Sequence, residues 1–143
     1  MAQGKHTYVI GAVSLLSSRL AAFVDGQLKD ITYRQWFLLT MIERMPRGEK
    51  SINDIADFAG TTRQNVRTMV TALEKKGFVQ VMPSKRDARA LTVSLTRKAK
   101  RCLAANAETM EGVEDKLFSQ LSPAEVDHLV SGLSKLLAAT ETE

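Results

Sequence analysis

The sequence predicts a mainly helical protein with one small antiparallel β-wing: a winged helix-turn-helix lobe flanked by N- and C-terminal helices. Two adjacent patterns predict this fold class. Residues 51–76 resemble two short helices joined by a glycine turn, and residues 78–95 alternate apolar and polar side chains around a basic loop. The 143 residues suit one domain, with the winged lobe expected at 31–95 and the flanking helices at 8–28 and 97–139.

The first expected helix covers residues 8–28, where apolar side chains recur at helical spacing. Residues 1–7 before it are polar and are expected to be loose. The apolar stripe consists of Ile10, Val13, Leu16, Leu20, Phe23 and Val24.

The second expected helix begins after Thr32, which together with Gln35 has the spacing of a capping box. It ends before residues 46–48, Pro-Arg-Gly. Because its apolar residues lie almost all round the helix, it is expected at the centre of the core. They are Trp36, Phe37, Leu39, Met41, Ile42 and Met45.

A short helix and a tight turn are predicted next. Ser51 and Asp54 have the spacing of a second cap, and the helix is expected to end at Ala59. Ala56 is small where two steeply crossing helices come closest, and Gly60 can take a positive φ at little steric cost. This combination is typical of a helix-turn-helix.

The helix that follows is expected between Thr62, whose hydroxyl can cap it, and Lys76, with Gly77 just beyond its end. Its two faces differ. The apolar face consists of Val66, Met69, Val70 and Leu73, and the polar face, free to enter a groove, consists of Gln64, Thr68, Thr71 and Lys75.

Residues 78–82 and 90–95 alternate at the period of β-strands, and a basic tip at 85–89 lies between them. Thr96 can cap a further helix to about Ser119, weakened at Gly112. Residues 122–125, Ser-Pro-Ala-Glu, then combine a capping box with a first-turn proline. The apolar stripe of this last helix contains Val126, Leu129, Val130, Leu133, Leu136 and Leu137.

Charge is distributed unevenly along the chain. Residues 61–101 contain eleven Lys and Arg against two acids, whereas residues 102–143 contain two Lys against eight acids. The local balance is therefore +9 in the first segment and −6 in the second. Such polarity attracts a polyanion to one surface, so double-stranded DNA is the expected partner.

The flanking helices carry longer apolar stripes than one small lobe can cover. A second copy would supply the missing surface, giving a two-fold homodimer with recognition helices about one DNA turn (~34 Å) apart on a pseudo-palindromic site. A monomer that folds its ends back on itself is the alternative.

The remaining composition indicates a soluble cytoplasmic protein without membrane contact. The chain has one cysteine, no signal-like start and no apolar run approaching about 20 residues. His6 and His128 are isolated, so no metal or other cofactor is expected, and Cys102 is interpreted as an ordinary buried or half-buried thiol and not as a redox switch. The sequence also has no catalytic constellation or phosphate-binding glycine loop, so we expect no enzyme activity.

These residues resemble the MarR-type winged-helix transcriptional regulators over nearly the whole chain. The likeness is densest at residues 66–79, VRTMVTALEKKGFV, and at residues 87–89, Asp-Ala-Arg, followed by Val-Ser-Leu-Thr at 93–96. It implies a triangular homodimer paired through its terminal helices. It also implies a repressor, occasionally an activator, that is released from DNA by a small, often phenolic, ligand between the dimer region and the winged lobe.

The resemblance also implies roles for individual residues. Arg89 matches a wing arginine that enters the minor groove, and Asp87 matches an aspartate that braces neighbouring cations. Ala59 and Thr61 depart from the usual apolar residues, and Ala99 from a frequent glycine. The full set expected to contact DNA is Thr62, Arg63, Gln64, Asn65, Arg67, Thr68, Lys85, Arg86, Asp87 and Arg89.

Two questions stay open at the level of the sequence. Trp36 and Met41 are candidates for an effector pocket, although core packing is the favoured interpretation of both. A winged helix can also serve as a protein-interaction module without specific DNA binding, and such a module would usually lack the concentrated basic face and wing tip.

Overall fold

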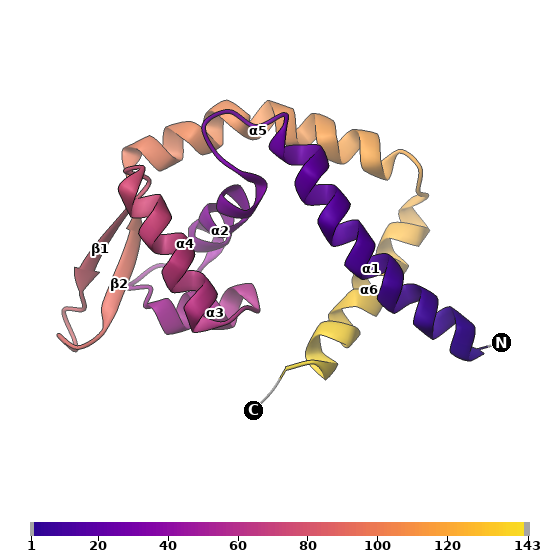
Figure 1. The fold of residues 1–143 in the computed structure, drawn as a ribbon, viewed down its shortest axis with the longest axis horizontal. Helices are drawn as coiled ribbons and strands as arrows, with labels where there is room; N and C mark the ends of the chain where they lie inside the picture. The colour runs from indigo at the N-terminus through magenta and orange to yellow at the C-terminus, as the bar shows by residue number, and fades with distance from the viewer. Residues whose placement is uncertain (1, 142–143) are drawn as a thin grey trace.

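The structure, a computed structural model, describes residues 2–141 and folds them into six helices and one antiparallel hairpin (Figure 1). The elements are α1 (Ala2–Asp25), α2 (Tyr33–Arg44), α3 (Ile52–Ala59), α4 (Arg63–Lys75), β1 (Val79–Pro83), β2 (Leu91–Leu95), α5 (Arg97–Phe118) and α6 (Pro123–Ala139). The predicted fold class, a mainly helical winged helix-turn-helix with flanking helices, is therefore confirmed.

The winged lobe, which we define as α2 to β2, has its own core. Leu38, Leu39 and Ile42 of α2 are buried at its centre, as expected for that helix. The helix is not buried on all sides, however, because Phe37 is 39% exposed. The other elements of the lobe contribute Ile52, Ile55, Ala56, Val66, Val70, Leu73, Phe78, Val79 and Val93.

Hydrogen-bonded caps fix where the helices begin. The capping boxes predicted at Thr32, Ser51 and Ser122 all form, each with the side chain three residues later. Thr62 and Thr96 cap α4 and α5 through single side-chain bonds. Because each cap depends on only four consecutive residues, these helix starts are fixed locally.

The predicted hairpin forms, with strands at residues 79–83 and 91–95 where 78–82 and 90–95 were expected. Val79 lies opposite Leu95, and Val81 lies opposite Val93. The loop between α2 and α3 extends this sheet, because the amide of Val93 donates to the carbonyl of Lys50 at 2.8 Å. A bridge between Ser51 and Thr92 continues the contact. The wing is therefore attached to the lobe along one edge.

Helix α5 runs unbroken through Gly112 and spans the molecule from the winged lobe toward α6 (Figure 1). Its one fully buried polar side chain within the described residues, Asn106, is 1% exposed. The Asn106 amide bonds both backbone groups of Lys29, in the turn between α1 and α2. A second small core joins Val24 of α1 to Met110 and Val113 of α5.

The N-terminal helix differs from the expectation in its bounds. It begins at Ala2 rather than residue 8 and ends at Asp25 rather than 28, so residues 2–7 are helical and not loose, whereas Met1 lies outside the described residues. The hydroxyl of Thr7 donates to the Gln3 carbonyl at 3.1 Å within this turn. Residues 3–7 are exposed and carry no apolar periodicity, so helical spacing could not predict this turn.

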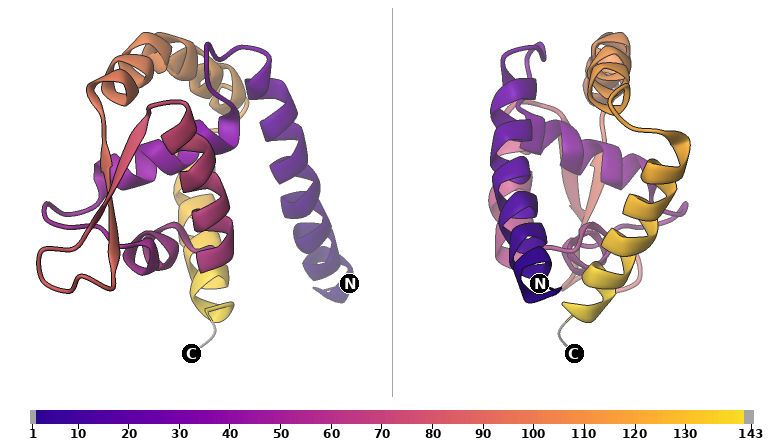
Figure 2. Two further views of the ribbon diagram at one scale, coloured as in Figure 1. Left: turned by 60° about the vertical axis from the view of Figure 1, so that its left-hand side comes forward. Right: turned by 90° about the vertical axis from the view of Figure 1, so that its right-hand side faces the viewer.

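Helices α1 and α6 leave most of their apolar side chains uncovered. They overlap in Figure 1 on the side away from the wing, whereas both views in Figure 2 show them apart. Helix α6 has no buried residue at all. Fourteen of the eighteen large apolar side chains found exposed in residues 2–141 lie on α1, α6 and the end of α5. The ends of the chain therefore do not fold back to cover one another.

Helix α1 also corrects the expectation that no apolar segment approaches 20 residues. Residues Gln3–Asp25 are long and apolar enough, by length and composition alone, to cross a membrane. The core helix of a soluble protein and a signal sequence pass the same test, so one such helix is weak evidence of a membrane span. The polar residues Ser14, Ser17, Ser18 and Arg19 interrupt the apolar side chains in its middle.

Candidate nucleic-acid interface

The turn between α3 and α4 sets the direction of the candidate recognition helix. Gly60 has φ 68°, the left-handed conformation expected for it. The amide of Thr61 donates to the carbonyl of Ala56 at 3.0 Å, which closes the turn. Ala56 is 3% exposed, so a larger side chain there would meet the core of the lobe.

Helix α4 keeps an apolar face in the core and a polar face in solvent. Val66, Val70 and Leu73 anchor it, each at most 4% exposed. The side chains predicted to contact DNA from this helix are all exposed: Thr62, Arg63, Gln64, Asn65, Arg67 and Thr68. Their exposure and their common position at the amino-terminal half of α4 would allow this end of the helix to enter a major groove.

Local bonds already hold part of this face. The Thr62 hydroxyl accepts from the amide of Asn65 at 3.1 Å, as the cap predicts. The Asn65 side-chain amide donates to the Thr61 hydroxyl at 3.2 Å, and the Thr68 hydroxyl donates to the Gln64 carbonyl at 3.0 Å. In the free chain the side chains of Asn65 and Thr68 are thus already hydrogen-bonded within the turn and α4.

The wing tip carries the second half of the candidate interface. Lys85, Arg86 and Arg89 are exposed on the loop between the strands. The Asp87 carboxylate accepts from the backbone amide of Arg89 at 3.0 Å. The resemblance implied that Asp87 braces neighbouring cations, whereas in the structure its carboxylate bonds the main chain of Arg89 and so fixes the backbone of the tip.

A shallow groove of about 280 Å³ lies between the recognition helix and the wing. It brings Arg67 of α4 together with Asp87 and Arg89 of the wing. Ser51 and Asn53 at the start of α3 complete the groove, and sequence reasoning did not select Asn53. The sequence does place Asn53 in the first turn of the helix predicted after the Ser51 cap, and this position could have indicated it as a candidate.

Glu49, another residue that sequence reasoning missed, lies at the base of the wing tip. Hydrogen bonds from the Ser84 hydroxyl and the Lys85 amide lower the pKa of its carboxyl, with the charges of Arg86 and Lys85 adding to the effect and desolvation opposing it. The group is therefore a carboxylate at neutral pH. No sequence pattern announces it, because its partners follow it by more than 30 positions.

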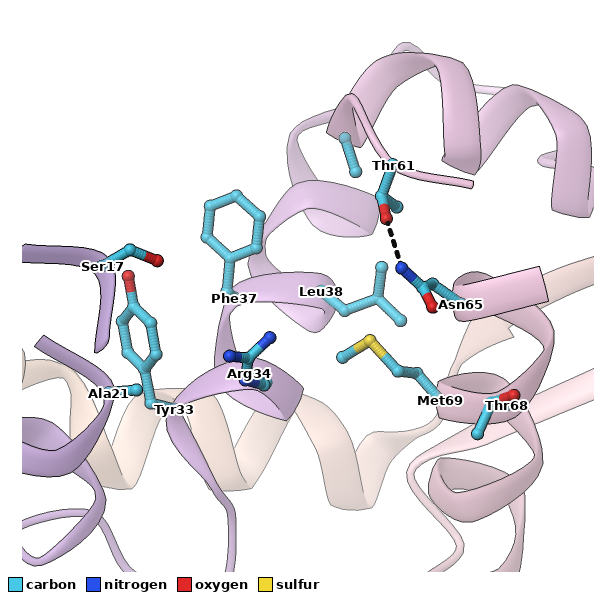
Figure 3. A pocket seen from close by; sticks show the side chains of 11 residues that line it. Ser17, Ala21, Tyr33, Arg34, Phe37, Leu38, Thr61, Asn65, Thr68 and Met69 are labelled. Carbon is cyan, nitrogen blue, oxygen red and sulfur yellow. Dashed lines mark hydrogen bonds between the residues drawn. The ribbon is translucent and has the colours of Figure 1, made fainter. Parts of the chain in front are cut away.

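A crevice of about 480 Å³ separates α1 from the winged lobe (Figure 3). Tyr33, Arg34 and Phe37 of α2 line it on one side. Figure 3 shows Asn65 and Met69 of α4 across from them. Ala59 and Thr61, the residues that depart from the family pattern, also contribute to its wall.

The two effector-pocket candidates from the sequence line a different hollow. Trp36 and Met41 face a space of about 260 Å³ between α1, α2 and α5. Tyr33 and Phe37 contribute to both hollows, and the rings of Tyr33 and Trp36 stack with centroids 6.1 Å apart. Trp36 is therefore adjacent to the larger crevice without lining it.

Cys102 is half-buried, as interpreted from the sequence. Burial is the main cause that raises the pKa of its thiol, and the negative charge of Asp30 adds to it. A thiol of this kind has little thiolate at neutral pH and low reactivity. Within residues 2–141, no group of three or more His, Cys, Asp or Glu side chains could hold a metal ion.

Comparison with known proteins gives relatives that are transcriptional regulators. Residues 31–91 match the model of the MarR family. YfiV, an uncharacterized HTH-type transcriptional regulator of Bacillus subtilis, is 28% identical over 137 residues, covering 96% of this chain and 84% of the relative. The family consists of transcriptional regulators and not of enzymes.

Solved structures share the fold. MepR of S. aureus in its complex with DNA superposes with a TM-score of 0.80 at 24% identity, covering 95% of this chain and 98% of that one. BpsR of Bordetella bronchiseptica gives a TM-score of 0.80 at 20% identity and 94% coverage of each chain. The match over residues 31–91, the relatives and the shared fold make this chain similar to the MarR family of winged helix-turn-helix transcriptional regulators.

Proposed function

We propose that the chain is a sequence-specific repressor that binds a pseudo-palindromic operator as a cytoplasmic homodimer. The observation that carries the proposal is the exposed polar face of α4 beside a basic wing on the same lobe, joined by the groove between Arg67 and Arg89. Helix α4 would read base edges in a major groove, while the wing would reach the neighbouring minor groove.

The uncovered terminal helices support the homodimer. Monomers rarely expose contiguous apolar surfaces of more than a few hundred Å². A two-fold copy could bury the stripes of α1 and α6. The acidic balance of residues 102–143 would keep DNA away from this region and direct it to the wings.

Arg89→Ala is expected to weaken operator binding by about 1–3 kcal/mol, because an arginine in a narrow minor groove meets concentrated negative potential. The loss should be largest for operators with A·T-rich flanks. Fluorescence anisotropy with a labelled operator, selected beforehand from a random DNA pool, measures the change.

Lys85→Ala is the matched control for Arg89→Ala, since it removes one positive charge from the same tip. A phosphate contact lacks sequence information, so its loss should lower the affinity for all DNA alike and reduce the salt slope by about 1. Unchanged affinity for Arg89→Ala would refute the minor-groove role. Absence of salt-dependent DNA binding by the unsubstituted protein would favour the protein-interaction alternative.

We further propose that the crevice in Figure 3 binds the effector that releases the operator. Tyr33 and Phe37 offer aromatic surface, and Arg34 offers a guanidinium that suits a carboxylate. These features fit a small hydroxylated aromatic acid. BpsR, of the same fold, is described with regulation of its DNA binding by 6-hydroxynicotinic acid, which belongs to this chemical class.

Arg34→Gln is expected to raise the concentration of 6-hydroxynicotinic acid that releases half of the operator by about tenfold, because it removes a charge-assisted bond. Trp36, the only tryptophan, stacks on Tyr33 and gives an independent fluorescence signal for binding. An Arg44→Gln variant, on the same helix but outside this crevice, is the control. Equal release of both variants would exclude Arg34 from the effector site.

A further inference from the structure

The segment between α2 and α3 lies against the wing at a defined place. Gly48 turns the chain there with φ 122°, a conformation that favours glycine. The next residues are then held to β2 by the bond from Val93 to Lys50 and by the bridge at Ser51. Glu49 lies between these fixed points, so its side chain starts from a constrained backbone position.

The Glu49 carboxylate binds the wing tip at two points. One oxygen accepts from the Ser84 hydroxyl at 2.6 Å, and the other accepts from the Lys85 amide at 2.7 Å. The Ser84 oxygen in turn accepts from the amides of Arg86 and Asp87 at 3.1 and 3.3 Å. Three consecutive backbone amides of the tip thus depend, directly or through Ser84, on one carboxylate of another segment.

We propose that Glu49 is a positioning residue for DNA binding: it fixes the wing tip in the arrangement that presents Lys85, Arg86 and Arg89 to the operator. The inference rests on the proposed function, because it assigns the fixed tip to operator recognition. Glu49 itself does not contact the DNA. It acts through Ser84 and the tip backbone.

Fixing the tip in advance favours binding because loop ordering costs conformational entropy, which a preorganised surface has already lost. Charge-assisted bonds such as those of Glu49 are stronger than neutral ones. The lowered pKa of Glu49 means that this ionised form is present at neutral pH. At the same time a carboxylate beside the wing repels DNA phosphates, so charge alone predicts that its removal strengthens binding. If Glu49 positions the tip, its removal should weaken DNA binding instead.

The first test uses the free protein and trypsin, which cleaves after Lys85, Arg86 and Arg89. Glu49→Ala should speed cleavage within the tip about tenfold, since cleavage follows the population of the open loop. Glu74→Ala removes the same charge from an exposed position on α4 and should leave the tip cleavage rate unchanged. Equal protection of Glu49→Ala and the unsubstituted chain would overturn the proposal. Near-identical thermal unfolding of both variants verifies that the fold is intact.

The second test measures affinity for the selected operator and for unrelated DNA. Glu49→Ala should bind the operator roughly five- to tenfold more weakly and lose protection of the flanking minor grooves from hydroxyl radicals. Ser84→Ala should produce the same pattern, and Glu49→Gln, which keeps an acceptor, should recover part of the affinity. Tighter operator binding by Glu49→Ala would show that its charge dominates and would overturn the proposal. If Glu49→Ala is cleaved fast in the tip but the unsubstituted chain binds no DNA, the role of Glu49 in fixing the tip holds and the proposed function is contradicted.

Discussion

Leu133→Asp is expected to convert the proposed dimer into monomers and to weaken operator binding by a factor of about 100 or more. Leu133 lies at the middle of the exposed α6 stripe, between Leu129 and Leu137, and is 40% exposed in the single chain. In a two-fold assembly each copy would bring an unpaired carboxylate into an apolar interface. Each such burial costs several kcal/mol.

The loss of operator binding follows from the loss of the dimer. Two linked lobes bind two half-sites with an effective concentration that separate lobes lack, which contributes a factor of about 10² to 10⁴. Isolated Leu133→Asp chains should therefore keep weak, salt-dependent DNA binding. Their specificity should be limited to a half-site.

Ser131→Asp provides the matched control for Leu133→Asp. Ser131 lies on the opposite side of the same helix and is exposed, so the same carboxylate there stays in water. Sedimentation velocity at micromolar concentration should give a dimer for Ser131→Asp and a monomer for Leu133→Asp. A monomeric unsubstituted chain would end the dimer proposal and leave the apolar faces of α1 and α6 to another partner.

Features determined by a few neighbouring residues could be predicted from the sequence. The caps at Thr32, Ser51, Thr62, Thr96 and Ser122 all form, because each is a contact between residues three positions apart. The left-handed turn at Gly60 is equally local. Period-two alternation also predicted the pairing of the wing strands.

Features that depend on residues far apart in the chain could not be predicted in this way. The bond between Glu49 and the wing joins positions 35 and 36 residues apart, and the Asn106 amide reaches a segment 77 residues away. Trp36 and Met41 were reasonable pocket candidates by residue type. Which side of α2 faces the larger crevice depends, however, on where α1 and α4 lie in three dimensions.

The exposed residues of the candidate interface could be predicted only in part. Spacing predicted that Gln64, Thr68 and their neighbours would face solvent, and they do. Their roles toward bases or phosphates depend on a DNA partner and stay predictions. The groove between Arg67 and Arg89 could be found only from the folded lobe, because its residues come from separate segments of the chain.

Asn106 couples the α1–α2 turn to α5. Its Oδ1 accepts from the Lys29 amide at 2.9 Å, while its Nδ2 donates to the Lys29 carbonyl at 3.1 Å and to the Cys102 carbonyl at 2.9 Å. The next residue, Asp30, has φ 64°, a conformation that costs a non-glycine residue energy and that the surroundings must stabilise. The Asn106 amide supplies that stabilisation by holding both backbone groups of Lys29.

Asn106→Ala is expected to lower the free energy of unfolding by about 2–4 kcal/mol. It leaves the Lys29 amide without its partner, leaves the Lys29 carbonyl only the weak bond from the Cys102 thiol, and removes packed volume. Urea unfolding at one fixed protein concentration measures the change, since dimerisation makes stability depend on concentration. Glu108→Ala, an exposed change near Asn106 on α5, should stay within about 0.5 kcal/mol. A loss of less than about 1 kcal/mol for Asn106→Ala would mean that water replaces the amide, and that packing of Val24 against Met110 and Val113 alone holds α1 to α5.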